Sequence, residues 1–256
     1  MLIAVAALCI CAALTRMAGH IITKRGGELE KKKDQETLSS EGGFELLMRD
    51  RYLMLIAILT VLINIVSLSG DFIFGKLLVD QTNHVVGTAA SLMKARKTYI
   101  GSYYASYYEW TNALSLIIQT FLVSRIYKKF GVRGSMFVLP VISLATFTTI
   151  LANPILQVVR VLKIAENSTN YSLQNTVRAA LLLPTSRNAK YKAKAAIETF
   201  CVRLGDVLQA GVILIGTSLH FGVKAFAGIT LAITLLWLFV ALKLYQEHKR
   251  RVPEFH

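Results

Sequence analysis

The chain has 256 residues, of which 54% are hydrophobic and only 17% are charged, and its mean hydropathy is +0.50. A soluble domain usually carries about 25% charged residues, so this composition argues against a soluble protein and for an integral membrane protein. The net charge is +14, but the basic residues lie mainly in the connections between apolar runs. That distribution is typical of membrane proteins and argues against nucleic acid as a partner.

Seven apolar segments follow one another, at approximately 2–15, 52–79, 99–126, 134–152, 154–183, 191–218 and 223–246. The first is short for a span of about 20 residues, so 1–15 is expected to be a truncated or short membrane helix. Residues 16–51 form a polar central loop that contains a short helix, 52–246 a six-helix bundle, and 247–256 a basic tail. The predicted fold is all-α, with about six to seven transmembrane helices.

The expected breaks between helices coincide with polar or helix-breaking residues. A basic turn is predicted at 127–134, and the other breaks at Asn153-Pro154, Pro184-Thr185-Ser186 and His220-Phe221-Gly222. The connections on one side carry twenty Lys and Arg residues, against five on the other side. This asymmetry predicts that the central loop and the tail lie in the cytoplasm, together with the C-terminus.

The stretch 160–206 is unusually polar for its position between apolar segments. Steps of three and four place Arg160, Lys163, Asn167, Asn170, Gln174 and Arg178 on one stripe of a helix. Because a charge at a bilayer centre costs about 2.5–3.5 kcal/mol, such a stripe is expected to line a protein cavity. The alternative is an amphipathic helix that lies on the membrane surface.

Further charged residues have both a functional and a structural interpretation. Lys190, Lys192 and Lys194 precede the next helix and could be orientation signals alone. Arg203 and Asp206 share a helical face and could form an intrahelical pair. The remaining candidates, Asp71, Lys76 and Glu109, could be paired or could extend towards the headgroups.

No set of residues predicts catalysis. The five histidines are scattered over connections and termini, and the three cysteines lack metal-ligand spacing. A phosphate-cradling glycine loop and a serine elbow are also missing from the sequence. We therefore expect a transporter and not an enzyme, with no cofactor, no metal and no catalytic residues.

Around this stretch the sequence resembles the ATP/ADP translocases of obligate intracellular bacteria and plastids, the nucleotide transporter family. The resemblance lies in Asn170-Tyr171-Ser172-Leu173, the Leu183-Pro184 turn, and Lys190-x-Lys192-x-Lys194-Ala195-Ala196-Ile197-Glu198, where the family ends with Asp. One departure is Asn64-Ile65-Val66-Ser67, which stands where the family has Asn-x-x-Glu. The match is good over about 163–206 and general elsewhere.

The resemblance implies half of a major-facilitator-like bundle, the C-terminal half of a divergent bacterial member. It further implies ATP:ADP exchange across the bacterial inner membrane, with the N-terminal half of the same carrier and membrane lipid as partners. The expected nucleotide-binding residues are Arg160, Lys163, Asn170, Asn175, Arg178, Lys190, Lys192, Lys194, Glu198, Arg203 and Asp206, with Asp71, Lys76 and Glu109 as further candidates. The alternative function is a non-transporting membrane scaffold or subunit, or an inactive fragment of a carrier.

Overall fold

The computed structural model describes residues 13, 15–17, 42–186 and 189–252. The chain divides into two compact units, Met1–Ser40 and Glu41–His256, and all the helices named below belong to the second unit. The helix expected at 1–15 and most of the loop expected at 16–51 lie outside the described residues. The described end of that loop contains a short helix, α3 (Gly43–Arg49), as predicted.

The longest helix, α4 (Arg51–Val85), organises the packing of the unit. Its 35 residues give a length of about 52 Å, well beyond the roughly 30 Å of a bilayer core. The side chain of Asp50 caps the helix by accepting a hydrogen bond from the backbone N–H of Tyr52 at 2.9 Å. Buried apolar side chains run along the whole helix, from Tyr52, Leu53 and Ile56 to Ile73, Phe74 and Leu78.

The next helices turn back and forth across the unit. A short turn, η1 (Ala90–Leu92), leads into α5 (Met93–Ile117), which continues through the π-helical turn η2 (Ile118–Leu122) into α6 (Val123–Ser135). After α7 (Val138–Ala152), the chain forms α8 (Leu156–Thr169), the π-helical turn η3 (Asn170–Gln174) and α9 (Asn175–Leu181).

The last two long helices follow the gap at 187–188. One consists of η4 (Ala189–Ala193), α10 (Lys194–Ala196), η5 (Ile197–Cys201) and α11 (Val202–Ser218), where η4 and η5 are again π-helical. The other is α12 (Val223–Arg251). Since π-helical turns within α-helices are frequent at functional sites, the three helices that contain them are candidates to carry such a site.

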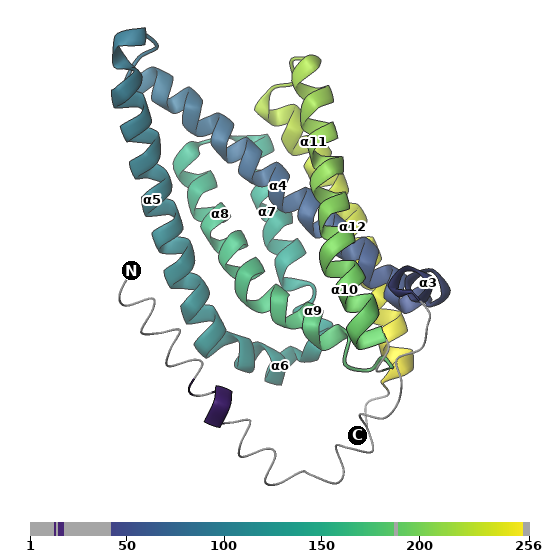
Figure 1. Cartoon of the computed structure of the whole chain (residues 1–256). Helices are drawn as coiled ribbons and strands as arrows, with labels where there is room; N and C mark the ends of the chain where they lie inside the picture. Colours follow the sequence, from purple (N-terminus) through teal and green to yellow (C-terminus); the bar gives the residue numbers. More distant parts are fainter. Residues whose placement is uncertain (1–12, 14, 18–41, 187–188, 253–256) are drawn as a thin grey trace. The chain divides into compact units, whose positions relative to one another are not determined.

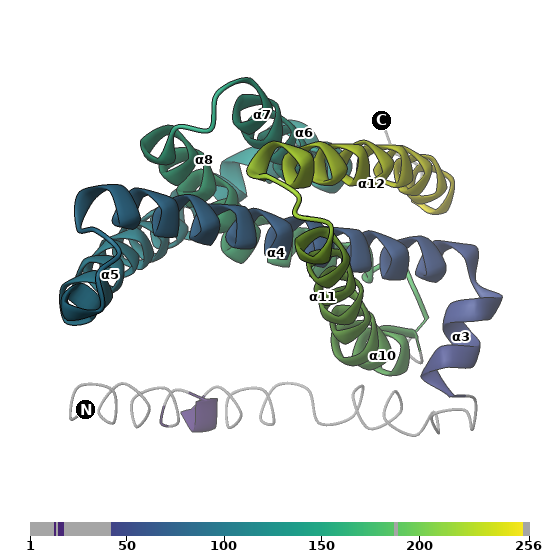
Figure 2. The same cartoon turned by 90° about the horizontal axis from the view of Figure 1, so that it is seen from above.

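Helix α4 contacts α5, α8, α11 and α12, and it crosses the unit diagonally (Figure 1). Seen from above, α7, α8 and α12 lie on one side of α4, and α10 and α11 lie on the other (Figure 2). The core between them includes Phe74 of α4, Tyr107 of α5, Phe147 of α7 and Trp237 of α12, all at most 2% exposed.

Most breaks between helices lie where they were predicted. Helices end at Ala152, Leu181 and Ser218, just before the three expected breaks. The basic turn at 127–134 is wrong in its bounds, because α6 continues to Ser135. The helical path is interrupted inside that range only at Gly131, whose φ of 65° is accessible to glycine at little cost.

Three described helices are long and apolar enough to cross a membrane: Arg51–Val85, Lys190–Ser218 and Val223–Arg251. A fourth span results if Met93–Ser135 and Val138–Ala152, which are bent by 76°, count as one. The helix at 156–181, which carries the polar stripe, is not in this set. The prediction of an all-α membrane protein is confirmed.

Candidate functional site

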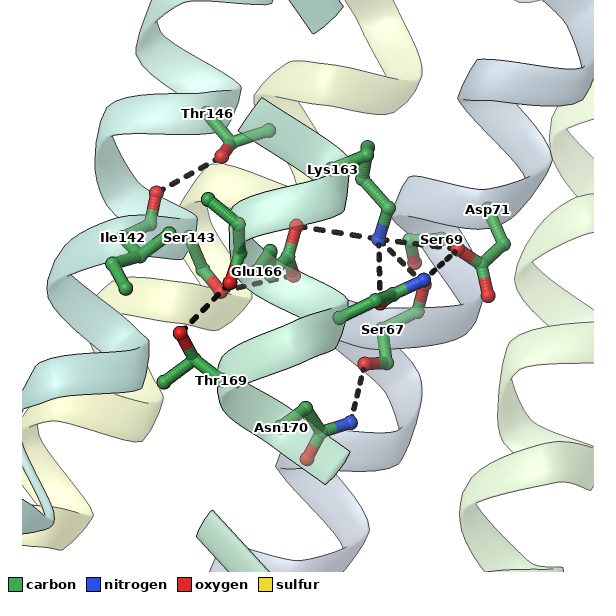
Figure 3. Close-up of polar contacts among 12 residues, drawn as sticks. Ser67, Ser69, Asp71, Ile142, Ser143, Thr146, Lys163, Glu166, Thr169 and Asn170 are labelled. Carbon is green, nitrogen blue, oxygen red and sulfur yellow. Dashed lines mark hydrogen bonds and ion pairs between the residues drawn. The ribbon is translucent and has the colours of Figure 1, made fainter. Parts of the chain in front are cut away.

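The most unusual feature of the unit is a lysine that is completely buried between helices. Lys163 of α8 has 0% exposure, and its Nζ lies 3.2 Å from Asp71 Oδ1 of α4 and 3.2 Å from Glu166 Oε2 of α8 (Figure 3). The ammonium group also donates to the Ser67 carbonyl at 3.4 Å. We call Lys163, Asp71 and Glu166 the ion cluster.

The side chain of Lys163 on α8 can come close to α4 because a glycine, Gly70, lies opposite it. A Cβ atom on Gly70 would lie 2.6 Å from Lys163 Nζ and 3.2 Å from its Cδ and Cε atoms. Any other residue at this position would therefore collide with the lysine side chain. Lys163 reaches Asp71 because α4 has no side chain in its way.

The two carboxylates of the ion cluster have different environments. Glu166 is 1% exposed and accepts a hydrogen bond from Ser143 Oγ of α7 at 3.0 Å (Figure 3). The side chain of Asp71 is 46% exposed, and its Oδ1 also accepts from Asn167 Nδ2 at 3.2 Å. Only Asp71 can therefore respond directly to a molecule outside the cluster.

Asp71 opens onto a pocket of about 540 Å³ between α4, α5 and α11. The pocket is mainly apolar, and its lining includes Lys76, Tyr104 and Thr217. Lys76 Nζ donates to the Phe221 carbonyl at 2.9 Å and lies 5.6 Å from the centre of the Phe226 ring. The ammonium group of Lys76 is thus held in the wall of the pocket.

The charges of the ion cluster do not cancel when all three groups are ionised, because two carboxylates face one ammonium group. Burial of charge is costly, so such a cluster is stable only when its members remain paired and hydrogen-bonded. Removing one partner from a buried pair usually costs about 3–5 kcal/mol. The cluster therefore ties α4, α7 and α8 together and makes their packing sensitive to charge.

The polar stripe of 156–181 packs mostly against neighbouring helices and does not face open space. Lys163, Asn167 and Gln174 are at most 3% exposed, and Asn167 Nδ2 donates to Tyr107 Oη of α5 at 2.7 Å. Asn170 donates to Ser67 Oγ of α4 at 3.2 Å. At these positions the stripe therefore packs against other helices and does not form the expected continuous lining of a cavity.

A second pocket of about 540 Å³ lies beside the π-helical turns η2 and η3. Its lining includes Ser115, Gln119, Tyr171 and Asn175. Asn175 Nδ2 donates to the Tyr171 carbonyl at 3.0 Å, and Asn175 Oδ1 accepts from Arg178. Asn175, which lines this second pocket, is thus also a partner of the partly buried Arg178.

The other predicted residues are spread over several surfaces. Arg160 donates to Ser106 Oγ at 2.8 Å and stacks 4.7 Å from the Tyr103 ring, which attaches it to α5. Glu109 is exposed on α5. Hence the structure brings Lys163 together with Asp71 but does not gather the whole predicted set.

The basic residues that carried the family resemblance lie on the helix 189–218. Lys190 and Lys192 belong to η4, and the exposed Lys194 lies 3.7 Å from Glu198 at the next turn. Further along, Arg203 Nη1 donates to Asp206 Oδ2 at 3.1 Å, so the predicted intrahelical pair is present. These residues form a charged row along the helix 189–218, in which Lys194, Glu198 and Arg203 are exposed and Lys190, Lys192 and Asp206 are partly buried.

Sequence reasoning did not include Glu166, Ser143 or Tyr107 among the site residues. A signal for Glu166 exists, because it follows Lys163 by three residues and so shares its helical face. No sequence signal identifies Ser143 or Tyr107, since both are placed by tertiary packing. Within the described ranges, no cluster of His, Cys, Asp and Glu is suited to hold a metal ion.

Two comparisons with known proteins, one with family models and one with curated proteins, agree on the same family. A family model described as "TLC ATP/ADP transporter" matches residues 1–248. The chain is 24% identical over 272 residues to ADP,ATP carrier protein 1 of Chlamydia muridarum and to that of Chlamydia trachomatis, covering 93% of this chain and 49% of each relative. The carrier of Chlamydia pneumoniae is 24% identical over 241 residues, which is 84% of this chain and 44% of that relative.

The chain thus spans about half the length of the curated relatives it matches. No solved structure matches it.

Proposed function

Because the chain belongs to the TLC ATP/ADP transporter family, we propose that it forms part of a transmembrane carrier for an anionic nucleotide, with exchange of ATP for ADP as its activity. The family is one of transporters and not of enzymes. Since the chain spans about half the length of its relatives, we assign the opposite wall of the translocation path to a second half-bundle, the N-terminal half of the same carrier.

The observation that carries this proposal is the ion cluster. Ionisable residues inside membrane helices are rare because they are costly, and they usually mark the path of a substrate or an ion. Lys163 and Glu166 are buried within the helix bundle, and Asp71 connects them to a pocket. A scaffold that only packs against lipid and protein does not need such a cluster.

The buried lysine is in our proposal a positioning residue and not a phosphate ligand. Its ammonium group is enclosed by the two carboxylates, so a nucleotide cannot reach it without breaking these ion pairs. We assign the phosphate contacts to the exposed cations Lys194 and Arg203, together with the partly buried Lys190, Lys192 and Arg178. Glu198 and Asp206 pair with Lys194 and Arg203, and would hold these cations in place when no nucleotide is bound.

Transport would follow from rocking of one half-bundle against the other around the bound nucleotide. In this mechanism the charged row along the helix 189–218 faces the partner half, and the ion cluster keeps α4 and α8 moving as one body. We place the carrier in the bacterial inner membrane with its basic tail in the cytoplasm, as the distribution of Lys and Arg favours.

Uptake of labelled ATP into proteoliposomes loaded with ADP tests the proposal. The chain is reconstituted alone and together with the N-terminal half of one of its relatives, and uptake is expected only for the pair. Lys194→Gln and Arg203→Gln, made separately, should each abolish uptake because each removes a phosphate contact. Lys249→Gln in the C-terminal part of α12 is the matched control and should leave uptake unchanged.

Two results would contradict the assignment. Unchanged uptake in both variants would remove Lys194 and Arg203 from the site. A pair that inserts and associates but never takes up nucleotide would favour the alternative of a non-transporting membrane scaffold.

A further inference from the structure

The second pocket, beside the π-helical turns η2 and η3, carries polar side chains but no charge. The two turns contact each other, and the pocket between α5 and the helix 156–181 has a volume of about 540 Å³. Its surface is mainly apolar, and none of the described residues that line it is charged. The polar lining residues are Ser115, Gln119, Tyr171, Ser172, Asn175 and Thr176. We call this the π-turn pocket.

Such a lining does not fit a phosphate, which requires cations. Apolar walls with a few hydrogen-bonding groups are typical of sites for small heterocyclic molecules, because the polar groups fix the orientation of the ligand. A nucleobase has two apolar faces and a polar edge, so it matches the π-turn pocket in chemistry.

An aromatic ring in the wall of the pocket offers a surface for stacking. Tyr171 of η3 is 50% exposed, whereas the next residue, Ser172, is 1% exposed. The backbone at Tyr171 is held by Asn175, whose Nδ2 donates to the Tyr171 carbonyl at 3.0 Å. Nucleobases stack on half-exposed aromatic rings of this kind.

Two hydroxyl groups of the pocket can accept a hydrogen bond from a ligand but cannot donate one. Ser115 Oγ donates its proton to the Thr111 carbonyl at 2.7 Å. Thr176 Oγ1 donates to the Ser172 carbonyl at 3.1 Å. A hydroxyl group has one proton and two lone pairs, so both oxygens keep only their acceptor capacity. They therefore favour a ligand with an amino group over one with a carbonyl group at the same place.

Gln119 adds an amide that can both donate and accept. It is an exposed residue of η2. A glutamine amide pairs with adenine through the N6 amino group and N7 of the base. Guanine has a carbonyl oxygen where adenine has its amino group, and hypoxanthine shares this carbonyl. The acceptors of the π-turn pocket thus select adenine among the purines.

We propose that the π-turn pocket is the adenine subsite of the carrier. Tyr171 stacks on the base, and the Gln119 amide bonds to N6 and N7. The second proton of the N6 amino group is directed to the hydroxyl oxygens of Ser115 and Thr176. The biological role of this subsite rests on the proposed nucleotide transport.

The position of the pocket agrees with the proposed phosphate contacts. Asn175 Oδ1 accepts from Arg178, and Arg178 also interacts electrostatically with Glu198 of η5. Arg178 therefore connects the π-turn pocket to the charged row along the helix 189–218. A nucleotide with its base in the pocket would extend its phosphates past Arg178 towards that row.

Photolabelling of the full chain in detergent with 2-azidoadenosine tests the subsite without phosphates. Mass spectrometry should find the label within segments 115–119 and 171–179. Adenosine should compete at least about tenfold more effectively than inosine, because the carbonyl group of inosine would face acceptors and remain unpaired. Labelling confined to other segments, or equal competition by the two nucleosides, would overturn the proposal.

Variants of Tyr171 test the stacking. Tyr171→Leu should weaken competition by adenosine at least about fivefold, since it removes the aromatic face. Tyr171→Phe keeps this face and should compete as the unchanged chain does. The matched control Phe239→Leu removes a ring that is 56% exposed on α12 and should also have no effect. Equal losses in Tyr171→Leu and Tyr171→Phe would contradict stacking on this ring.

A change of preference excludes misfolding as the cause. Ser115→Ala removes one acceptor, so the preference for adenosine over inosine should fall about two- to tenfold while inosine competes as before. A misfolded protein cannot show this result. Ser102→Ala is the control, because Ser102 Oγ makes a similar bond to the Tyr99 carbonyl on an exposed part of α5. An unchanged preference in Ser115→Ala would overturn the assignment of the hydroxyl groups.

The subsite and the carrier function can fail separately. Labelling uses a nucleoside and the chain alone, so it depends neither on phosphate contacts nor on transport. Labelling in the π-turn pocket without uptake by the reconstituted pair would support the subsite and contradict exchange. Uptake of ATP together with labelling at another place would retain the carrier and overturn the subsite.

Discussion

Gly70 of α4 and Lys163 of α8 are in direct contact, since a Cβ atom on the glycine would come within 2.6 Å of the lysine Nζ. The end of a lysine side chain can usually move aside at little cost. Here the ammonium group is held by Asp71, Glu166 and the Ser67 carbonyl, so moving it breaks ion pairs in a buried environment.

The substitution Gly70→Ala should therefore destabilise the protein by about 1–2 kcal/mol, because overpacking outweighs the gain in helix propensity of about 1 kcal/mol. The measurement is the free energy of unfolding in detergent. Gly101→Ala is the control, because Gly101 lies in α5 with no atom within 4 Å of its added Cβ. That variant should be neutral or more stable, and equal effects at both glycines would contradict the fit between Gly70 and Lys163.

Removing the charge of Lys163 should have a larger effect than removing an exposed charge. Lys163→Met leaves Glu166 buried without its cation, so we expect a loss of about 3–5 kcal/mol in the free energy of unfolding. Lys194→Met breaks only the exposed pair with Glu198 and should cost at most about 1 kcal/mol.

A double variant distinguishes the lost ion pair from a packing defect. Adding Glu166→Gln to Lys163→Met removes the unpaired carboxylate and should restore at least about half of the lost stability. If the double variant is no more stable than the single one, the loss of stability in Lys163→Met comes from altered packing. The ion pair with Glu166 then does not contribute to it.

Acid should weaken the contact between the start of α4 and the end of α12. Burial alone would raise the pKa of Asp50, but the hydrogen bonds from Arg251 and from the Tyr52 N–H outweigh it, so this pKa lies below its usual range. The carboxylate therefore stabilises the fold above its unfolded pKa of about 3.9, and this contribution is lost as the pH falls through the lower pKa of the folded protein.

Thermal unfolding of Asp50→Asn and of the unchanged chain between pH 3 and pH 7 measures this contribution. The unchanged chain should be more stable above about pH 4, and the difference should shrink below that value. A difference that is constant over the whole range would mean that the Asp50 charge does not contribute, and that only its capping of α4 matters.

A buried amide on α11 should be replaceable with a gain in stability. Gln209 is 2% exposed, and neither of its amide atoms has a hydrogen-bond partner among the described residues. Gln209→Met removes the cost of burying these groups at a similar volume and should stabilise the protein by about 1–2 kcal/mol. Gln246→Met, at an exposed position of α12, should change stability by less than about 0.5 kcal/mol. A destabilised Gln209→Met would point to a buried water bound by the amide.

The order of the helices and most of the breaks between them could be read from the sequence. Long apolar runs and breakers such as Pro154 and Pro184 act locally, so they mark helices and turns without knowledge of the fold. Gly131 was not recognised as the main interruption of its segment. Its neighbours Lys128, Lys129 and Arg133 predict a solvated turn, yet the chain stays helical around it.

The geometry of the candidate site could be predicted only in part. Periodicity places Lys163 and Asn167 on one face of a helix, but it does not say what lies opposite that face. The partners Asp71 and Tyr107 come from other helices, and Gly70 has no distinguishing mark in the sequence. In addition, the π-helical turn η3 inserts an extra residue, which shifts Gln174 and Arg178 away from the simple spacing of three and four.

The contact between Asp50 and Arg251 also constrains how the chain is threaded through the bilayer. Asp50 immediately precedes α4 and Arg251 is the last residue of α12, and they hydrogen-bond although 201 residues separate them. Both must therefore lie on the same side of the membrane, and the chain between them must cross it an even number of times. Three crossings, the number of single helices that are long and apolar enough, would leave the two residues about 30 Å apart on opposite sides. Four crossings, with the bent pair Met93–Ser135 and Val138–Ala152 counted as one span, satisfy this condition without the helix at 156–181.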